Sequence, residues 1–372
     1  MIIGVPKEIK DNEYRVGLVP SSVRELTHHD HQVLVETQAG NGIGVSDQDY
    51  EAAGASIIPA ASEIFSRSDM IVKVKEPQPS ECDLLRSGQV IFTFLHLAAD
   101  PEQTKALLKS GCIAIAYETV TSPKGGLPLL APMSEVAGRM SIQAGAHYLE
   151  KEEGGSGILL GGVPGVQPGK VTILGGGVVG MNAACMATGL GADVTLFDKS
   201  LPRLAELDMF FGSRLRTLYP TVEAIEHSVR DSDLVIGAVL IPGAAAPKLV
   251  SEALIKKMRK GSVLVDVAID QGGCFETSRP TTFSAPIYSE HGVIHYCVSN
   301  MPGAVARTSA FALNNATLPF ILALATKGYQ KALSDDPHLR AGLNIYQGQV
   351  TYEAVARDLG YQYSAFESHL FS

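Results

Sequence analysis

The sequence contains few cysteines, and their spacing does not suggest a site. Five cysteines lie far apart among 372 residues, with no CxxC motif. A zinc site or a disulfide framework needs paired or regularly spaced cysteines. We therefore expect neither, and a reducing cytoplasm is the location that fits this cysteine usage.

Long apolar runs and blocks of a single charge are also missing. The apolar start MIIGV is too short for the core of a signal peptide. The most apolar late stretch, residues 317–325, contains Pro319 and is shorter than the roughly 20 residues that span a bilayer. The net charge of −9 comes from acidic and basic residues mixed along the chain. We therefore predict neither a membrane nor a nucleic acid as a partner.

Short β-rich apolar runs alternate with helix-like segments, a pattern typical of parallel α/β folds. A first block has runs at 32–36, 70–74, 90–97 and 112–118, and a second has runs at 171–177, 193–198, 233–240, 262–268 and 293–298. The second block is long enough for a complete doubly wound sheet. Neither block reads as a structural repeat of the other.

Chain length and helix patterns predict a two-domain α/β fold joined by long helices. Helix patterns cover 132–151 and 302–327, and the tail from Asp335 shows helical and turn signals. We predict a Rossmann-type, doubly wound parallel domain at 133–301 that binds NAD. Residues 1–132 and 302–372 are predicted to form a discontinuous α/β domain for substrate and catalysis.

A glycine loop follows the first strand of the second block and fits GxGxxG with Gly175, Gly177 and Gly180. The first glycine permits a tight turn, the second lets the backbone approach a pyrophosphate, and the third lets the helix lie close to the strand. The phosphates would lie at the helix N-terminus. The next strand ends at Asp198, at the spacing of a carboxylate that binds ribose hydroxyls. Asp198 would repel the 2′-phosphate of NADP, so we predict NAD despite Lys199 and Arg203 nearby. A glycine turn without a ligand is the structural alternative.

Four residues outside this loop are candidates for chemistry. His96, Lys75 and Asp270 follow apolar runs, where parallel sheets present functional groups, and the guanidinium of Arg15 suits a substrate carboxylate. A core histidine, a solvated lysine, a turn aspartate and a surface arginine are the ordinary alternatives. The HHDH cluster at 28–31 lacks a spaced ligand pair, so we interpret it as a solvated loop and predict no metal.

Several longer motifs are more specific than GxGxxG and together span nearly the whole chain. They are MIIGVPKEIKDNEYRVGLVP, VKVKEPQPSE, FTFLHLAAD, APMSEVAGRMS, GGVPGV, VLIPGA, VDVAIDQGGCFETSRPTT and HYCVSNMPGAVART. The chain thereby resembles the alanine dehydrogenase family, which uses NAD and is related to the nucleotide-binding subunit of proton-translocating transhydrogenase.

The resemblance gives a role to each of the four candidates: Arg15 and Lys75 bind the substrate, and His96 and Asp270 are catalytic. It assigns cofactor contacts to Ser134, Val178, Val179, Asp198, Arg203, Val239, Leu240, Val267, Ala268, Ile269, Asp270, Arg279, Val298, Ser299, Asn300 and Met301. Two departures are Pro220, where many members have a serine that contacts the adenosine half, and Ala306, where proline is common. Family analogy also raises a metal role for Glu118, which we do not predict.

The activity implied by the resemblance is reversible oxidative deamination of L-alanine to pyruvate and ammonia, with hydride transfer to NAD. His96 would act as general acid and base, and the assembly would be a homohexamer. Two alternatives stay open. A transhydrogenase-type subunit would exchange hydride with a partner's cofactor, and a non-catalytic NAD-binding regulator would need no particular residue at position 96.

Overall fold

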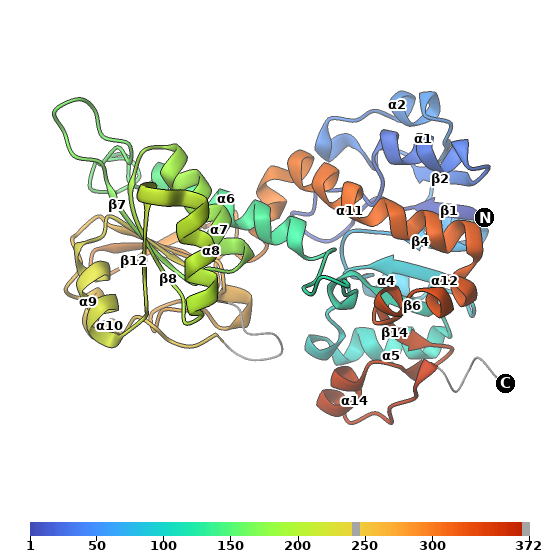
Figure 1. The fold of residues 1–372 in the computed structure, drawn as a ribbon. Coiled ribbons are helices and arrows are strands. Elements are labelled where there is room, and N and C mark those ends of the chain that lie inside the picture. The colour runs from blue at the N-terminus through green and yellow to red at the C-terminus, as the bar shows by residue number, and fades with distance from the viewer. Residues whose placement is uncertain (240–245, 367–372) are drawn as a thin grey trace. The chain divides into compact units, whose positions relative to one another are not determined.

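The structure, a computed structural model, describes residues 1–239 and 246–366 (Figure 1). The chain forms two compact units, one of Met1–Met133 with Val305–Ser372 and the other of Ser134–Ala304. Each unit contains one sheet flanked by helices. Which unit serves the substrate and which the cofactor remains a prediction.

The sheet of the first unit has eight strands in the order β15-β14-β6-β5-β4-β1-β2-β3. Its strands are β1 Ile2–Val5, β2 Gln32–Glu36, β3 Ser56–Ile58, β4 Met70–Val72, β5 Val90–Thr93, β6 Ile113–Ala116, β14 Leu343–Tyr346 and β15 Gln349–Val350. The helices are α1 Pro20–His28, α2 Asp47–Ala52, α3 Ala61–Arg67, α4 Pro79–Cys82, α5 Pro101–Ser110, α11 Ala306–Lys327, α12 Tyr329–Asp335, α13 Pro337–Arg340 and α14 Glu353–Leu359. β1 to β6 are parallel, and β14 and β15 extend the sheet in antiparallel fashion.

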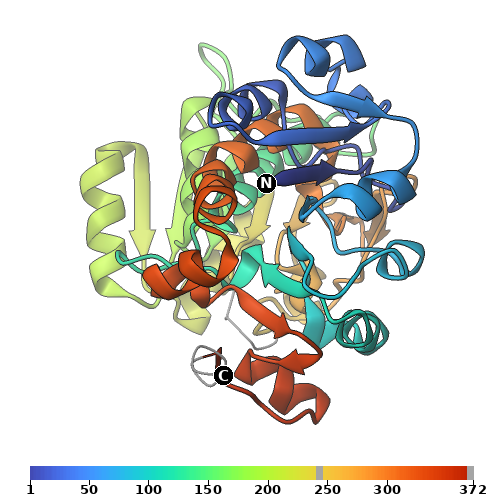
Figure 2. The ribbon, with the colours of Figure 1, turned by 90° about the vertical axis from the view of Figure 1, so that its right-hand side faces the viewer.

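The C-terminal strands differ from the sequence prediction. The tail after Asp335 was expected to hold helices and turns, but β14 pairs with β6 and β15 pairs with β14. Figure 2 shows these orange-red strands beside the blue-green ones. A four-residue run such as LNIY is too short to show a period, and its conformation depends on pairing with a strand more than 200 residues earlier.

The sheet of the second unit has seven strands in the order β12-β13-β11-β10-β7-β8-β9. They are β7 Lys170–Leu174, β8 Asp193–Phe197, β9 Leu215–Leu218, β10 Leu234–Gly237, β11 Val263–Asp266, β12 Ile287–Glu290 and β13 Val293–Tyr296. The helices are α6 Ala131–Tyr148, which begins in the first unit, α7 Val178–Gly189, α8 Leu201–Phe211, α9 Val222–Asp231 and α10 Glu252–Ile255. Only β12, at the edge, is antiparallel within this sheet. The five β-rich runs of the second block all contain strands.

The six parallel strands follow the same spatial order in both sheets. When only the parallel strands of each unit are numbered along the chain, that order is 3-2-1-4-5-6, the doubly wound pattern. The two blocks therefore share a topology, which the sequence analysis did not detect because their connections differ in length and composition. The winding direction reverses between β1 and β4 in one sheet and between β7 and β10 in the other. Ligands of doubly wound proteins bind beyond the carboxyl ends of the strands at such switch points.

Helix α11 packs into the core of the first unit. By length and apolar composition, the stretch Met301–Lys327 could cross a membrane. In the structure, however, α11 contacts α1, and its Asn314 is fully buried. The Asn314 side chain accepts from the Val19 amide at 2.8 Å and donates to the Gly17 carbonyl at 3.1 Å. These bonds satisfy backbone groups that have no partner in a helix or sheet ladder.

This contact yields a test of the core. Asn314→Leu should lower the free energy of unfolding by about 1–3 kcal/mol, because the buried Val19 N–H would lose its acceptor. The neighbouring Asn315 is exposed, and Asn315→Leu should change stability by less than about 0.5 kcal/mol. Chemical denaturation of both variants measures the difference, and equal effects would contradict the role given to Asn314.

Candidate active site

Lys75 lies at the switch point of the first sheet, three residues beyond the end of β4. Its carbonyl accepts from the Thr93 hydroxyl at 2.8 Å, and its amide points to Glu8 Oε1 at 3.4 Å. The side chain is largely buried, and burial, followed by the positive charge of Arg15, lowers the pKa of its ammonium. The positive charges of Arg15 and Lys75 repel each other, so an anion that binds between or beside them would be stabilised.

Arg15 is fixed by Glu13, a residue that the sequence analysis did not select. Arg15 Nε and Nη2 donate to the two carboxylate oxygens at 2.7 and 2.6 Å, and the Arg15 amide donates to Oε1 at 3.0 Å. Arg15 Nη1 lies 3.1 Å from Met133 Sδ. Burial alone would raise the pKa of Glu13, but the hydrogen bonds and charge of Arg15 bring it below its ordinary value. The only sequence signal was the spacing in EYR, which places both side chains on one side of an extended segment.

His96 follows β5, but not as a strand residue. The predicted run extended to residue 97, whereas β5 ends at Thr93. The reason is Glu118, whose Oε1 accepts the His96 amide at 2.6 Å and the Leu95 amide at 3.2 Å, turning the chain out of the ladder. His96 then adopts a left-handed conformation with φ of 52°, which is unusual for a residue other than glycine.

The His96 ring stands half exposed at this turn. It is stacked parallel to Phe94, with 5.8 Å between ring centres, and its Nδ1 lies 3.9 Å from Glu118 Oε1. Glu118 thus holds the backbone of the histidine and places a negative charge near its ring. Among residues 1–239 and 246–366, no group of three His, Cys, Asp or Glu side chains could hold a metal.

The glycine loop of the second unit has the conformation that its motif requires. Gly175 has φ of +105°, and a Cβ at Gly180 would lie 1.8 Å from the Gly175 carbonyl oxygen. A Cβ at Gly177 would meet nothing within 4 Å. α7 begins at Val178, and Gly177 gives it no side-chain cap. The amides of its first turn can therefore bind an anion, so the loop fits a pyrophosphate.

Asp198 and Arg203 hold the loop from the side of β8 and α8. Asp198 Oδ2 accepts the Gly176 amide at 2.7 Å, and Oδ1 accepts the Ser200 amide at 2.8 Å. Arg203 Nε donates to the Gly176 carbonyl at 2.7 Å. A carboxylate has about four acceptor positions, so Asp198 keeps capacity for hydroxyl groups. Its charge and half-buried place fit a ribose better than a phosphate.

Val239 follows β10, and Asp270 follows β11, the strand beside it. A Cβ on Gly175 would lie 3.1 Å from Val239, so the ends of β7 and β10 meet at the switch point. Asp270 is exposed on a short turn, Ile269–Gln271, after β11. That turn is organised by buried Asp266, which accepts from the Cys274 amide at 2.8 Å and the Ser278 hydroxyl at 2.5 Å. Asp266 is a second positioning carboxylate that the sequence analysis missed.

The remaining predicted residues lie elsewhere in the second unit. Arg279 lies over the Tyr288 ring, 3.7 Å from its centre. Val298 pairs with Thr281, and Asn300 has a left-handed backbone. The other positions are Ser134 in α6, Val178 and Val179 at the start of α7, Val267 and Ala268 after β11, Ser299 after β13, Met301 at the start of the Met301–Val305 turn, and Pro220 between β9 and α9. Leu240 lies outside the described residues.

The predicted residues thus fall into two groups. Arg15, Lys75 and His96 belong to one unit, in which the charge of Arg15 acts on Lys75, and the glycine loop, Asp198 and Val239 gather at the switch point of the other. Asp270 belongs to the second unit.

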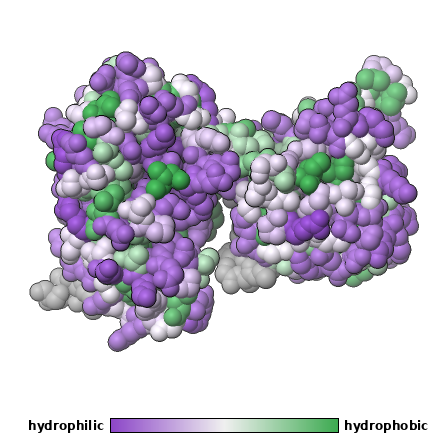
Figure 3. Space-filling model, turned by 180° about the vertical axis from the view of Figure 1, so that it is seen from behind, coloured by the Kyte–Doolittle hydropathy of each residue, from purple (hydrophilic) through white to green (hydrophobic). Residues whose placement is uncertain are grey.

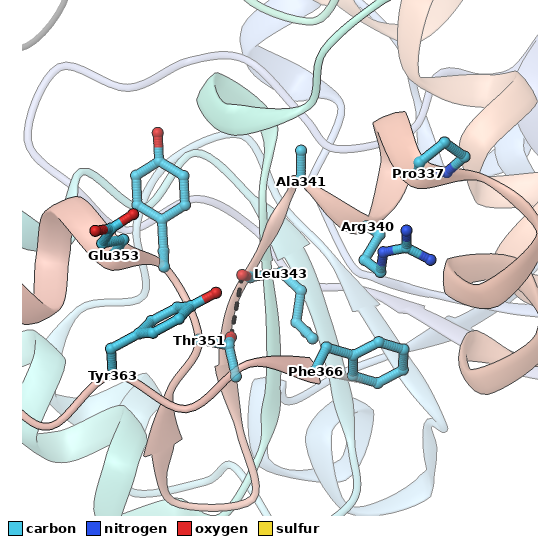
Figure 4. Close-up of a pocket in the computed structure, with 9 residues that line it drawn as sticks. Pro337, Arg340, Ala341, Leu343, Thr351, Glu353, Tyr363 and Phe366 are labelled. Atoms are coloured by element: carbon cyan, nitrogen blue, oxygen red, sulfur yellow. Dashed lines mark hydrogen bonds between the residues drawn. The ribbon is translucent and has the colours of Figure 1, made fainter. Parts of the chain in front are cut away.

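A separate pocket of about 280 Å³ lies near β14 and α13 (Figure 4). It is lined by Pro337, Arg340, Ala341, Leu343, Thr351, Tyr352, Glu353, Tyr363 and Phe366. The Thr351 hydroxyl donates to the Leu343 carbonyl at 3.1 Å along one side. None of the predicted site residues lines this pocket, so it plays no part in the candidate active site.

The sequence matches one family of known proteins along nearly its whole length. Residues 4–137 match the family model "Alanine dehydrogenase/PNT, N-terminal domain", and residues 141–353 match "Alanine dehydrogenase/PNT, C-terminal domain". The alanine dehydrogenase of Halomonas elongata is 61% identical over 98% of both chains. That of Bacillus subtilis is 58% identical over 100% of this chain and 98% of its own.

Solved structures agree with the sequence matches. An L-alanine dehydrogenase superimposes with a TM-score of 0.94 at 55% identity, covering 97% of this chain and 99% of that one. A transhydrogenase from Sinorhizobium meliloti has a TM-score of 0.83 at 25% identity, covering 94% and 100%. These findings confirm the predicted two-domain α/β fold and the classification as an amino-acid dehydrogenase, and they do not favour a transhydrogenase subunit. The chain belongs to the alanine dehydrogenase/PNT family.

Proposed function

We propose that this chain catalyses the NAD-dependent, reversible oxidative deamination of L-alanine to pyruvate and ammonia in the cytoplasm. The observation that carries the proposal is a pair of cations that act on each other, buried Arg15 and partly buried Lys75, the second of which lies at the switch point of the first sheet. L-Alanine and pyruvate share a carboxylate, the group that such a pair binds. His96 follows the neighbouring strand β5 and supplies a titratable ring.

The cofactor would be held by the second unit. Gly175, Gly177 and Gly180 would approach its pyrophosphate together with the first turn of α7, and Asp198 would accept its ribose hydroxyls. The other proposed contacts are Ser134, Val178, Val179, Arg203, Val239, Leu240, Val267, Ala268, Ile269, Asp270, Arg279, Val298, Ser299, Asn300 and Met301. When bound, NAD accepts the hydride that leaves the Cα atom of alanine.

The protein's own residues orient the substrate and move protons. Arg15 and Lys75 fix the carboxylate, which turns the encounter of substrate and cofactor into an oriented one. A ring nitrogen of His96 takes a proton from the water that attacks the substrate carbon and returns a proton to the departing ammonia. We assign to Asp270 the orientation or charge balance of this proton path. Because the amine must be neutral to release hydride, alkaline pH favours deamination.

A homohexamer is also part of the proposal and rests on the family resemblance. The loop between α6 and β7 projects from the second unit and forms a small turn in which Val163 pairs with Val166. Leu159, Val163 and Val166 are exposed there, and the projecting tip shows apolar colour in Figure 3. Exposed apolar clusters of this kind support association between copies.

The proposal as a whole is tested at His96. The protein with NAD and L-alanine should form NADH, followed by absorbance, and pyruvate with ammonia should consume it. His96→Ala should reduce kcat by about 100-fold or more, the usual contribution of a general acid and base, while NADH binding is retained. Full activity in the variant would remove His96 from the mechanism, and NAD binding without turnover in the unaltered protein would instead indicate a regulator.

Lys75 provides a pH test. Its pKa is lowered by burial and then by Arg15, so on going to alkaline pH it loses its proton earlier than an ordinary lysine does. Carboxylate binding needs the protonated form, and the KM for pyruvate should therefore rise as pH increases through this lowered pKa. Lys75→Arg stays charged throughout, so its KM, although changed at neutral pH, should vary less with pH. Parallel profiles for the two proteins would contradict this role.

Asp198 provides the test of cofactor choice. Asp198→Asn keeps an oxygen that can accept the Gly176 amide but removes the negative charge that repels a 2′-phosphate. The ratio of kcat/KM for NAD to that for NADP should fall by about tenfold, which corresponds to about 1.4 kcal/mol. Asp208→Asn removes the same charge from an exposed position of α8 and should leave the ratio unchanged. An equal shift in both variants would indicate a general charge effect.

A further inference from the structure

Three charged side chains are buried at the switch point of the first sheet, next to Lys75. Glu8 follows β1, Lys73 follows β4 directly, and Glu81 belongs to α4. Their side chains are 2%, 0% and 3% exposed. Lys73 Nζ donates to Glu8 Oε2 at 2.9 Å and to Glu81 Oε1 at 2.8 Å. Burial opposes the charge of Lys73, but the two carboxylates together raise its pKa, and it stays protonated.

Such a cluster is an expensive way to stabilise a core. Removing charges from water is costly, and apolar side chains of similar volume often stabilise a protein equally well. The position of the cluster at the switch point suggests that it fixes the backbone there. The ladder between β1 and β4 ends at the pair Gly4 and Ile71, so the segment after β4 needs other contacts to fix its path.

Glu8 supplies those contacts on the side of β1. Its Oε1 accepts the Val74 amide at 2.6 Å and lies 3.4 Å from the Lys75 amide, while its Oε2 faces Lys73. On the side of β5, the Phe94 amide donates to the Val74 carbonyl at 3.3 Å and Thr93 holds the Lys75 carbonyl. One carboxylate thus joins the end of β1 to the backbone that carries the Lys75 side chain.

Glu81 ties the third element to the cluster. Its Oε2 accepts the Gln78 amide at 2.8 Å and caps α4, while its Oε1 faces Lys73. Lys73 therefore links a residue after β1 with the first turn of α4, and the chain from Lys73 to Gln78, which includes Lys75, is held at both ends.

We infer that Glu8 is a positioning residue for the substrate-binding cation. Glu8 fixes the backbone position of Lys75 by accepting the Val74 amide and facing the Lys75 amide. Lys73, itself bound to Glu81, holds the Glu8 carboxylate in the orientation that these contacts need. The inference rests on the proposed function, in which Lys75 binds the carboxylate of alanine or pyruvate. It adds Glu8, Lys73 and Glu81 to the residues on which substrate affinity depends.

The test is Glu8→Gln in the full-length protein. The new amide places an NH₂ group opposite either the Lys73 ammonium or the Val74 N–H, so two donors face each other. We expect the KM for pyruvate to rise by about tenfold, as for one lost charge-assisted hydrogen bond, and kcat to change by less than about twofold. The Kd of NADH, measured by fluorescence, should stay the same because the proposed cofactor residues belong to the other unit.

A second variant separates positioning from general stability. In Glu8→Gln combined with Lys73→Met, no ammonium opposes the amide, whose oxygen can accept the Val74 N–H. The KM should recover by about threefold or more relative to Glu8→Gln alone, since contacting residues are not additive. If Glu8 has a purely structural role, the double variant should have a KM at least as high, and a thermal midpoint at least as low, as Glu8→Gln alone. That result would overturn the inference.

Two further variants complete the design. Glu36→Gln makes the same change in a partly buried carboxylate that holds the Lys7 amide at 2.8 Å, and its KM should stay within about twofold of the unaltered protein. Lys75→Met separates the two hypotheses. If it leaves the KM for pyruvate unchanged, the proposed function is wrong at this residue. If it raises that KM while Glu8→Gln does not, the positioning inference alone is wrong.

Discussion

The constraint on which both units depend is the loss of ladder partners where a doubly wound sheet reverses its direction. The pairing of β1 with β4 ends at Gly4 and Ile71, and that of β7 with β10 ends at Leu174 and Gly237. Beyond these points the two strands no longer pair with each other, so backbone groups that face the lost partner need another one. The first unit meets this need with carboxylates and the second with glycine backbone and Asp198. The consequence is one region rich in buried cations and another rich in exposed amides.

The cations of the first unit differ in how their charge is balanced. Arg15 has the carboxylate of Glu13 along its guanidinium, and Lys73 has two carboxylates at its ammonium. The charge of Lys75 is not balanced in this way. Burial and then Arg15 lower the pKa of its ammonium, and the opposing effects of Glu76 and Glu13 are weaker. A bound carboxylate would therefore be most favourable at Lys75, where it would compensate a charge that the fold leaves poorly compensated. On this ground the proposed substrate is a small acid rather than a neutral metabolite.

Much of this could be predicted from the sequence, because local pattern determines it. The β-rich runs, the glycine loop and the Asp198 spacing depend on residues close together in the chain, and the longer motifs identified the family. The carboxylates Glu8, Glu13, Glu118 and Asp266 could not be selected in this way. Their role is to accept backbone amides, and for Glu8 and Glu118 those amides lie 66 and 22 residues away, a relation that leaves no periodic signal. For the same reason, the sequence did not predict the left-handed turn at His96 or the pairing of β14.

These carboxylates also explain why the candidate residues can be at once exposed and fixed. His96 and Asp270 stand on turns outside the ladders, where a side chain can reach a substrate but the backbone has few regular hydrogen bonds. Glu118 and Asp266 supply those bonds from buried or half-buried positions, and Glu8 does so for Lys75. A carboxylate suits this task better than an amide because it only accepts, so it can bind several N–H groups without presenting a donor to any of them. Replacement by an amide preserves the shape but reverses one of these polar contacts. For this reason we expect the sites beyond the strand ends to tolerate isosteric amide substitutions less well than the apolar core tolerates changes of similar volume.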